Sequence, residues 1–379
     1  MAHIEICNVK KKFKKTIAID DISLDIKDNE FFVLFGPAGA GKTTTLNIIA
    51  GIAFPDQGYV KIDGKIVNLL EPAKRNVSMV FENYALYPHL TVYDNIASPM
   101  RSPTFKKDEA YIKQEIERVT AILGISKLLD RLPKQLSNGQ KQRVALGRCL
   151  VRKPNVFLMD EPLAHLDAKL RHFMRAELKE MQSNFNTTTI YVTHDYMEAL
   201  SLGDRIGILN NGKIEQIGVG DDIFYRPANE FIAKMMGEPE INILEIELVQ
   251  EAAKFGLRIF NMDKVFELPR DVEAAFRRKV PNDVDMGIRA NDIEISISKK
   301  SDEYIHGTVY SIEPIGNKSV LIIAVNDIQI RTIVPNDFSA ELDSDIYMKI
   351  NYKNAIYFDR NTKAFIFRHE NEDLSEKVI

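Results

Sequence analysis

The chain has few cysteines and no tryptophan. It contains two cysteines among 379 residues, Cys7 and Cys149, and neither belongs to a C-x-x-C pair. This count excludes a disulfide-stabilised scaffold and a cysteine zinc site, and it favours a reducing compartment. We expect both thiols to behave as small buried hydrophobic side chains.

The chain also lacks long hydrophobic runs and an excess of either charge. No segment approaches 18 consecutive apolar residues, and the N-terminus has no apolar stretch typical of a secretion signal. We therefore expect neither an integral membrane protein nor a secreted one, so any membrane association has to come through a partner. The formal net charge of −4 provides no basic surface for nucleic acid, so no nucleic-acid partner is expected.

The most informative segment matches the phosphate-binding pattern G-x-x-x-x-G-K-[ST]. An apolar run, Phe31 to Phe35, predicts a strand before it, and a helical pattern follows it. Glycines in such a loop let backbone N–H groups converge on phosphate oxygens at a helix N-terminus, where the helix dipole favours negative charge. We expect Lys42 to reach the β- and γ-phosphates and the Thr43 hydroxyl to hold Mg²⁺. The residues expected to bind the nucleotide here are Gly36, Pro37, Ala38, Gly39, Ala40, Gly41, Lys42, Thr43 and Thr44.

A second apolar run, Val156 to Met159, ends in the carboxylates Asp160 and Glu161. Parallel strands of α/β proteins end in this way at active sites. A strand here, beside the one that precedes the phosphate-binding loop, would bring Asp160 near Mg²⁺. Glu161 would then face the γ-phosphate, where a carboxylate polarises an attacking water. A core strand followed by a polar loop is the alternative interpretation.

Two more segments carry polar residues at predicted element ends. Residues 136–143 combine Ser, Asn and Gly at the start of a helical pattern, which predicts a second anion-binding helix N-terminus. Residues 189–193 predict a strand that delivers His194 at its end. A lone histidine is as often an ordinary surface or core residue as a functional one.

In this order, the motifs resemble those of the ATP-binding subunits of ABC transporters. Within them the chain is similar to the carbohydrate-importer type, such as the ATPases of maltose or glycerol-3-phosphate uptake, over nearly its whole length. The resemblance implies an α/β fold: a P-loop nucleotide-binding domain over residues 1–236, with a helical subdomain at about 87–150. Residues 237–379 are expected to form a small all-β barrel of the OB type, with dimer and regulatory contacts.

Periodicity agrees with these two domains. In the expected helical subdomain, apolar residues recur at spacings of three and four, namely Ile112, Ile116, Val119 and Leu123. After Gly237 the apolar residues alternate instead, over residues 293–297, 328–334 and 365–367, which predicts strands. The charged tail from His369 onward is expected to be frayed.

The resemblance also implies residue roles, with ATP and Mg²⁺ as cofactors. Ser137, Gly139 and Gln140 belong to the family signature that contacts the nucleotide, and Phe13 matches the aromatic that stacks on adenine, although an ordinary strand-end aromatic is the alternative. Glu161 corresponds to the catalytic base and His194 to the switch histidine. The implied catalytic residues are Glu161, His194 and Lys42, and the implied metal ligands are Thr43, Glu82 and Asp160.

Three residues depart from the family pattern. Glu82 stands where glutamine is usual, Asn138 replaces the first glycine of the signature, and Ala164 replaces a serine. A carboxylate is a good Mg²⁺ ligand but adds negative charge beside a polyphosphate. Such departures occur in paired, non-identical ATPase subunits. The ATPase dimer is therefore expected to be either a heterodimer with a related subunit or a homodimer.

The implied partners are membrane permease subunits that dock on Glu82 to Leu90, a second ATPase subunit and, indirectly, an extracytoplasmic solute-binding protein. These place the protein at the cytoplasmic face of the membrane. The main rival is a soluble ABC-type ATPase outside transport. The interval between Lys42 and Ser137 is too short for the coiled coil of chromosome-maintenance members, and there is no second P-loop as in ribosome-associated members. A weakly hydrolysing regulatory subunit remains a further alternative.

Overall fold

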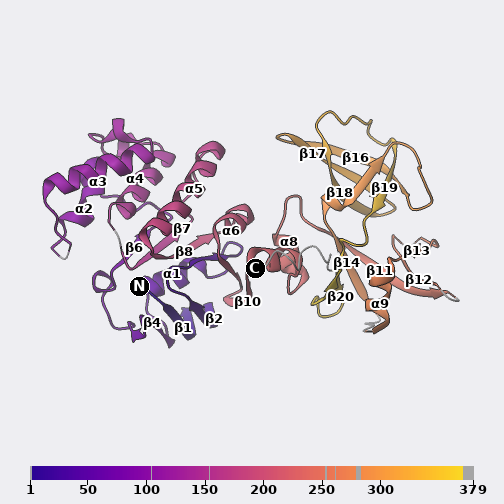
Figure 1. Ribbon diagram of the computed structural model, residues 1–379, viewed down its shortest axis with the longest axis horizontal. Helices are drawn as coiled ribbons and strands as arrows, with labels where there is room; N and C mark the ends of the chain where they lie inside the picture. The colour runs from indigo at the N-terminus through magenta and orange to yellow at the C-terminus, as the bar shows by residue number, and fades with distance from the viewer. Residues whose placement is uncertain are drawn as a thin grey trace. The chain divides into compact units, whose positions relative to one another are not determined.

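The computed structural model describes residues 2–103, 105–152, 154–251, 254–260, 262–278 and 283–369. It divides into two compact units, Met1–Gly220 and Asp221–Ile379, which are described separately (Figure 1). The division falls before the domain boundary that we predict after residue 236. The reason is that the start of α8 (Glu230–Met235) is held by the second unit, since Glu230 N donates to Lys363 O and Phe365 N to Ala228 O.

The first unit contains a six-stranded sheet in the order β10-β9-β3-β8-β7-β6. Its central strands are buried on both faces and pair in parallel, as their continuous apolar sequences require. In register, Phe35 lies opposite Thr193, and Val192 lies opposite Asp160, so the strand ends meet at one edge. The strands are β3 (Phe31–Phe35), β6 (Val77–Val80), β7 (Val156–Asp160), β8 (Thr188–Thr193), β9 (Arg205–Asn210) and β10 (Lys213–Gly218).

One detail of the sequence analysis is wrong. We expect β7 directly beside β3, but β8 lies between them. The distance is bridged by α1 (Lys42–Ala50), which follows β3 and packs against both β7 and β8. Its first turn therefore still reaches the end of β7.

The first unit also contains a four-stranded antiparallel sheet. Its order is β2-β1-β4-β5, with β1 (Ile4–Phe13), β2 (Thr16–Ile26), β4 (Gln57–Ile62) and β5 (Lys65–Ile66). Ile4 on β1, Leu46 on α1 and Val192 on β8 belong to one buried cluster. The helix is thus held between the two sheets by a shared core.

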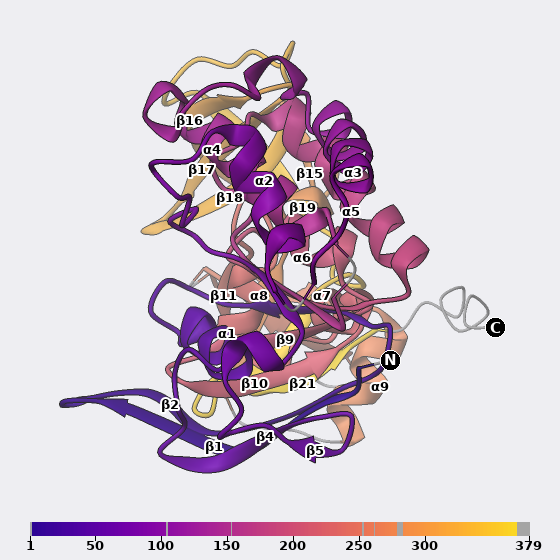
Figure 2. The ribbon, with the colours of Figure 1, turned by 90° about the vertical axis from the view of Figure 1, so that its left-hand side faces the viewer.

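The expected helical region contains α2 (Val92–Arg101), α3 (Glu109–Ile122) and α4 (Asn138–Leu150). Figures 1 and 2 show these helices grouped at one end of the first unit, away from β1, β2 and β4. The four apolar residues spaced by three and four are buried, as predicted. Two further helices, α5 (Ala168–Phe185) and α6 (Tyr196–Leu202), flank β8 in sequence.

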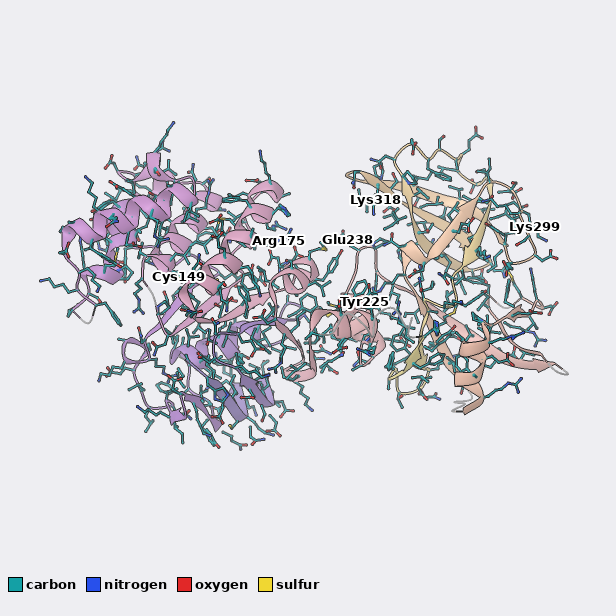
Figure 3. The ribbon with its side chains drawn as sticks, in the orientation of Figure 1. Cys149, Arg175, Tyr225, Glu238, Lys299 and Lys318 are labelled. Atoms are coloured by element: carbon teal, nitrogen blue, oxygen red, sulfur yellow. The ribbon has the colours of Figure 1, made fainter. Side chains whose placement is uncertain are left out.

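The two cysteines differ in environment. Cys149, on α4, is buried inside the first unit, and burial raises the pKa of its thiol to about 11 (Figure 3). Cys7 is only half-buried, so the expectation of two buried thiols holds for Cys149 alone.

The second unit is built mainly from strands, consistent with an OB-type domain. One sheet runs β13-β12-β11-β14-β20-β21 and the other β15-β19-β16-β17-β18, and both contribute to one core. The alternating segments predicted as strands are β15, β18 and β21. The strands are β11 (Asn242–Glu251), β12 (Lys254–Arg258), β13 (Phe266–Glu267), β14 (Val284–Ile288), β15 (Ile293–Ser296), β16 (Ile305–Ile315), β17 (Lys318–Val325), β18 (Ile328–Pro335), β19 (Asp345–Ile350), β20 (Ile356–Asp359) and β21 (Phe365–Arg368).

Helices α7 (Gly220–Tyr225) and α9 (Arg270–Arg278) are further elements, and α9 buries Val272 and Phe276 in the core of the second unit. The sequence analysis did not predict this helix inside the β-domain. Residues 370–379 of the expected frayed tail lie outside the described residues. Across the described ranges, no helix is both long and apolar enough to cross a membrane.

Candidate active site

The phosphate-binding pattern folds into a tight loop between β3 and α1. Gly41 has a φ of 108°, a backbone conformation that favours glycine, and it is the N-cap of α1. A Cβ there would lie 2.5 Å from the carbonyl oxygen of Ala18, and one at Gly36 would lie 2.1 Å from that of Leu209. These glycines are therefore required by backbone packing, and they present the first turn of α1 to the end of the sheet.

Lys42 is buried at the start of α1. Its Nζ donates hydrogen bonds of 2.9 Å to the carbonyl oxygens of Gly36 and Pro37, and it lies 4.0 Å from Glu161 Oε1. Burial lowers the pKa of Lys42, while the charges of Glu161, Asp160 and Glu82 raise it. A lysine ammonium has three donors, so two shape the loop and the third is left for an anion.

Thr43 and Asp160 meet across the sheet edge. The Thr43 hydroxyl donates to Asp160 Oδ1 at 3.1 Å, and Asp160 is buried. Burial raises the pKa of Asp160 to about 6, the charges of Glu82 and Glu161 add to this shift, and the Thr43 hydrogen bond opposes it. The site thus concentrates carboxylates that a cation would neutralise.

Mg²⁺, which the family implies, fits this donor set. It prefers oxygen ligands and is usually held by one or two carboxylates together with substrate phosphates. Thr43, Asp160 and the exposed Glu82 supply a hydroxyl and two carboxylates, and Glu82 is close enough to act on the pKa of Asp160. In the described part of the chain no cluster of three or more His, Cys, Asp or Glu residues forms a complete metal cage.

Glu161 and His194, the residues expected to act as base and switch, contact each other at the site. His194 Nδ1 lies 2.9 Å from Glu161 Oε1, and the histidine side chain is 60% exposed. The Glu161 backbone has a φ of 45°, a strained value for a residue with a side chain, and its N–H is anchored on Val192 O at 3.0 Å. A small cavity of about 60 Å³ adjoins the pair and is also lined by Ala164.

Sequence reasoning missed the buried support beneath this pair. Glu198, on α6, accepts hydrogen bonds from Tyr191 at 2.9 Å and from Thr193 at 2.7 Å, so it fixes the strand end that carries His194. Burial raises the pKa of Glu198, whereas the two hydroxyl donors lower it. No pattern in the sequence distinguishes this glutamate from a solvated helix residue.

Gln142 is a second residue that sequence reasoning missed. Its Nε2 donates to Glu161 O at 3.2 Å, and its Oε1 accepts from His165 N at 3.1 Å. It is buried on α4, so the signature helix contacts the segment that carries Glu161. The sequence showed that Gln142 belongs to the signature helix, but only the fold shows which way its side chain points.

The signature residues begin α4. Ser137 is the N-cap and accepts from Gln140 N, while the Gln140 side chain accepts from Ser137 N at 3.0 Å. Gly139 lies close to His165, since a Cβ there would be 3.1 Å from His165 O. Asn138 is the first residue of the helix and has no positive φ, so its backbone does not need a glycine. The structure brings Lys42, Thr43, Asp160, Glu161 and His194 together, whereas the Ser137 and Gln140 side chains bond within the helix cap.

Phe13 lies at the end of β1 and is 49% exposed. The Lys11 ammonium lies 5.2 Å from the centre of its ring and pairs with Asp56 at 2.9 Å. The ring is thus presented to solvent beside a positive charge, an arrangement that suits both expectations, a stacking platform or a strand-end aromatic.

The segment from Glu82 to Leu90 is held by side chains from two helices. Tyr84 and Ala85 both have positive φ, at 65° and 44°. Arg148, on α4, donates to both of their carbonyl oxygens, at 3.0 and 2.7 Å. Asn95, on α2, accepts from Tyr87 N and donates to Leu90 O. These hydrogen bonds fix the backbone of this irregular loop, so the loop presents a defined surface.

The model of the family "ABC transporter" matches residues 19–164. The trehalose/maltose import ATP-binding protein MalK of Thermococcus litoralis is 38% identical, over 97% of this chain and 100% of the relative. The oligosaccharides import ATP-binding protein MsmX of Bacillus subtilis is 40% identical over 98% and 99%, and an sn-glycerol-3-phosphate import ATP-binding protein, UgpC 3, of Rhizobium johnstonii is 38% identical over 96% and 100%.

Solved structures of ABC cassettes resemble more than half of this chain. The dimeric bacterial ABC transporter cassette MJ0796 matches 57% of this chain and 98% of its own, with a TM-score of 0.54 and 30% identity. The same cassette in a post-hydrolysis state, bound to ADP and Pi, gives a TM-score of 0.53. The matched motifs and the full-length relatives agree with the geometry of the site: the chain belongs to the ABC transporter family, as an ATPase of its import-type ATP-binding proteins.

Proposed function

We propose that this protein is the ATP-hydrolysing subunit of a membrane importer for a sugar, a polyol or a glycerol phosphate. The observation that carries the proposal is the 2.9 Å contact of His194 with Glu161, next to Lys42 and the Thr43–Asp160 pair. This arrangement places a carboxylate base and a phosphate-binding site at the same edge of the sheet. The solute class rests on the relatives, which are named for import of trehalose and maltose, oligosaccharides and glycerol 3-phosphate.

In this proposal ATP binds with its phosphates on Gly36 to Thr44 and its adenine on Phe13. Thr43, Asp160 and Glu82 would hold Mg²⁺, which would neutralise charge on the phosphates. Lys42 donates to the β- and γ-phosphates from a position fixed by the loop carbonyls. Asp160 is buried, where the effective dielectric constant is lower than in water. Its carboxylate therefore attracts a cation more strongly than an exposed carboxylate would.

Glu161 then polarises a water for attack on the γ-phosphorus, and His194 holds the water and the carboxylate in line. The new bond joins the water oxygen to phosphorus, the bond to the β–γ bridging oxygen breaks, and the carboxylate accepts the proton. The hydrogen bond from Glu161 N to Val192 O and the buried Glu198, which holds Thr193 just before His194, keep these groups in place before the substrate arrives.

A second ATPase subunit completes each site in this proposal. Ser137, Gly139 and Gln140 begin a helix whose N-terminus favours a phosphate, and they would face the nucleotide held by the other subunit. The dimeric cassette that this chain resembles supports association in pairs. A homodimer and a heterodimer with a related subunit both fit, because Asn138 keeps a regular helix start.

Closure of the dimer would move the segment from Glu82 to Leu90 and with it the permease helices docked there. An extracytoplasmic solute-binding protein would deliver the solute to the permease. The ATPase itself would work at the cytoplasmic face of the membrane. Arg148 and Asn95 support this assignment, because their hydrogen bonds hold the backbone of the segment in a defined conformation.

The proposal is tested by affinity capture of the tagged chain from gently solubilised membranes, followed by mass spectrometry. Recovery of multi-spanning permease subunits is expected, and a second ATPase beside them would identify a heterodimer. Recovery of soluble partners alone would move the protein out of transport. ATP turnover of the captured complex separates the main proposal from a weakly hydrolysing regulatory subunit, which Glu82 favours and the Glu161–His194 pair opposes.

A further inference from the structure

The end of β1 that carries Phe13 is irregular, and one residue from outside the strand holds it. The pairing of β1 with β2 shifts register on both sides of Lys11. Such bulges interrupt the ladder of backbone hydrogen bonds and need other partners. Asp56 supplies them, because its Oδ2 accepts from Lys12 N at 2.7 Å and its N–H donates to Lys10 O at 2.8 Å. These two hydrogen bonds fix the end of β1.

The other carboxylate oxygen of Asp56 holds the Lys11 ammonium over the Phe13 ring. Lys11 Nζ lies 2.9 Å from Asp56 Oδ1 and 5.2 Å from the centre of the ring. The Lys11 side chain is only 15% exposed, whereas Phe13 is 49% exposed. Hydrogen bonds from Lys11 and from Lys12 N lower the pKa of Asp56, so the carboxylate is charged at neutral pH. One face of the ring is thus covered by a fixed cation, and the exposed part is open to a planar ligand.

Asp56 also connects two parts of the proposed nucleotide site. It lies in the segment between α1, whose first turn would bind the phosphates, and β4. This segment starts against α1, since Ile52 N and Ala53 N both donate to Asn47 O, at 2.9 and 3.1 Å. The aromatic ring is therefore tied to the helix that follows the phosphate-binding loop.

We propose that Asp56, acting through Lys11, is a positioning residue for the base of the nucleotide. It holds the Phe13 ring ready to stack, with one face covered and the other open. A ring that is already ordered spares the ligand the cost of ordering it, which is roughly threefold to tenfold in affinity for one side chain. The inference rests on the proposed function, because it takes adenine to be the ligand of Phe13. It makes the base contribution to affinity depend on Asp56 and leaves the phosphate contribution independent of it.

Binding of ADP and of tripolyphosphate to the full chain is measured by calorimetry. Lys11→Met and Asp56→Ala should each weaken ADP binding by about threefold to tenfold and leave tripolyphosphate affinity within about twofold. Lys11→Arg keeps a cation that pairs with Asp56, so it should bind ADP like the parent chain. Equal losses for ADP and tripolyphosphate would mean general damage to the site and would overturn the positioning role.

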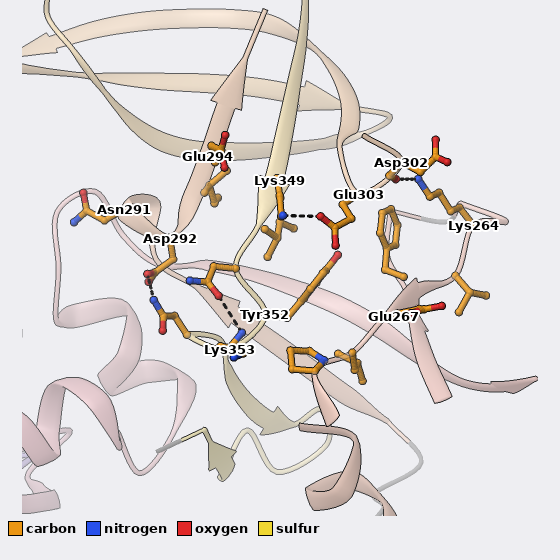
Figure 4. Close-up of a pocket in the computed structure, with 18 residues that line it drawn as sticks. Lys264, Glu267, Asn291, Asp292, Glu294, Asp302, Glu303, Lys349, Tyr352 and Lys353 are labelled. Carbon is orange, nitrogen blue, oxygen red and sulfur yellow. Dashed lines mark hydrogen bonds and ion pairs between the residues drawn. The ribbon is translucent and has the colours of Figure 1, made fainter. Parts of the chain in front are cut away.

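Two other lysines that lie over aromatic rings provide matched controls. Lys61 lies 5.4 Å from the centre of the Tyr59 ring, in the same sheet as β1. Lys264, in the second unit, lies 4.8 Å from the centre of the Phe266 ring, and Figure 4 shows it bonded to Asp302. Lys61→Met and Lys264→Met should each keep ADP affinity within about twofold. A loss in both as large as that of the tested variants would overturn the specific role proposed.

The order of the ring is measured separately, without nucleotide. The chain has no tryptophan, so Phe13→Trp places a single fluorophore at the platform. Its anisotropy decay should show a restricted ring, and addition of Asp56→Ala should increase the fast local motion on the nanosecond scale. Unchanged local motion would overturn the proposal.

Phe13→Ala separates failure of this inference from failure of the nucleotide pose. If Phe13→Ala weakens ADP binding while Lys11→Met and Asp56→Ala bind ADP like the parent chain, the pose stands and the positioning role is wrong. If Phe13→Ala leaves ADP affinity unchanged, the base does not stack on this ring, and the pose and the positioning role are both wrong.

Discussion

The guanidinium of Arg148 donates a hydrogen bond of 2.7 Å to the carbonyl oxygen of Ala85. A second one, of 3.0 Å, reaches Tyr84 O, and the guanidinium also lies 5.5 Å from the centre of the Tyr87 ring. Arg148 stands on α4, the helix that starts with the signature, and the other three residues belong to the proposed permease surface. The pair therefore joins the helix that would sense nucleotide to the loop that would move the permease.

Replacement of Arg148 by lysine tests this link. Lys keeps the positive charge but loses the planar fork that serves two carbonyls at once. We expect solute-stimulated ATPase activity of the reconstituted transporter to fall roughly fivefold to tenfold, as loss of about 1–1.4 kcal/mol implies. Nucleotide affinity of the isolated chain should stay within about twofold. The control is Arg175→Lys, at an arginine on α5 outside this segment; equal effects of the two variants would contradict the proposed link.

The sequence was sufficient for the parts of the site that lie on one continuous motif. The loop from Gly36 to Thr43 follows from glycine conformation and helix capping, which are local properties. The strand ends at Asp160 and His194 were also predictable, because apolar runs mark buried strands. The predicted strand order was wrong. The position of β8 between β3 and β7 depends on how the chain crosses between strands, and a local sequence pattern contains no information about this.

Residues that act through long-range contacts could not be predicted. Glu198 and Gln142 are polar residues on helices, and only the fold shows that both are buried and bond to the strand ends or loops of the site. Helix α9 was missed because the strands around it dominate the pattern of that domain.

Substitution of Glu161 by glutamine separates the base from the binding site. The amide keeps the size of the side chain but is a very weak base, so turnover should fall by about 10²–10⁴ while ATP affinity is retained. Exposed Glu117 on α3 supplies the control, Glu117→Gln, which should be unaffected. Turnover near that of the parent chain would remove Glu161 from the base role.

The same Glu161→Gln chain reports the subunit composition. With ATP bound and not hydrolysed, a homodimer should form from the purified chain alone and double the mass seen by light scattering. If the chain stays monomeric with saturating ATP and Mg²⁺, a related partner subunit is required, and the homodimer is excluded under these conditions.

Asp160 should make the stability of the nucleotide-free protein depend on pH. Its folded pKa of about 6 lies above the unfolded value of roughly 3.9, so the native state binds more protons between these values. Stability is therefore lost as the pH rises from about 4 to 6. Asp160→Asn removes this loss, and its unfolding free energy should exceed that of the parent chain by about 2–3 kcal/mol at pH 7 but match it near pH 4.

This comparison requires urea unfolding curves of the first unit at several pH values, without Mg²⁺. Asp130→Asn, at an exposed carboxylate, is the control and should run parallel to the parent chain. If the Asp160→Asn curve also runs parallel, burial of the Asp160 carboxylate does not govern the pH response.

Phe13 provides a test of the nucleotide pose that does not involve the phosphates. If adenine stacks on this ring, Phe13→Ala should weaken ADP binding by about 5- to 150-fold, since base–aromatic stacking contributes roughly 1–3 kcal/mol. Binding of tripolyphosphate, which has no base, should be unchanged, because Lys42 and the loop remain. Phe173→Ala on α5, at 46% exposure against 49% for Phe13, controls for loss of an exposed ring. Equal losses for ADP and tripolyphosphate would mean that the substitution disturbs the loop, and unchanged ADP affinity would return Phe13 to an ordinary strand-end aromatic.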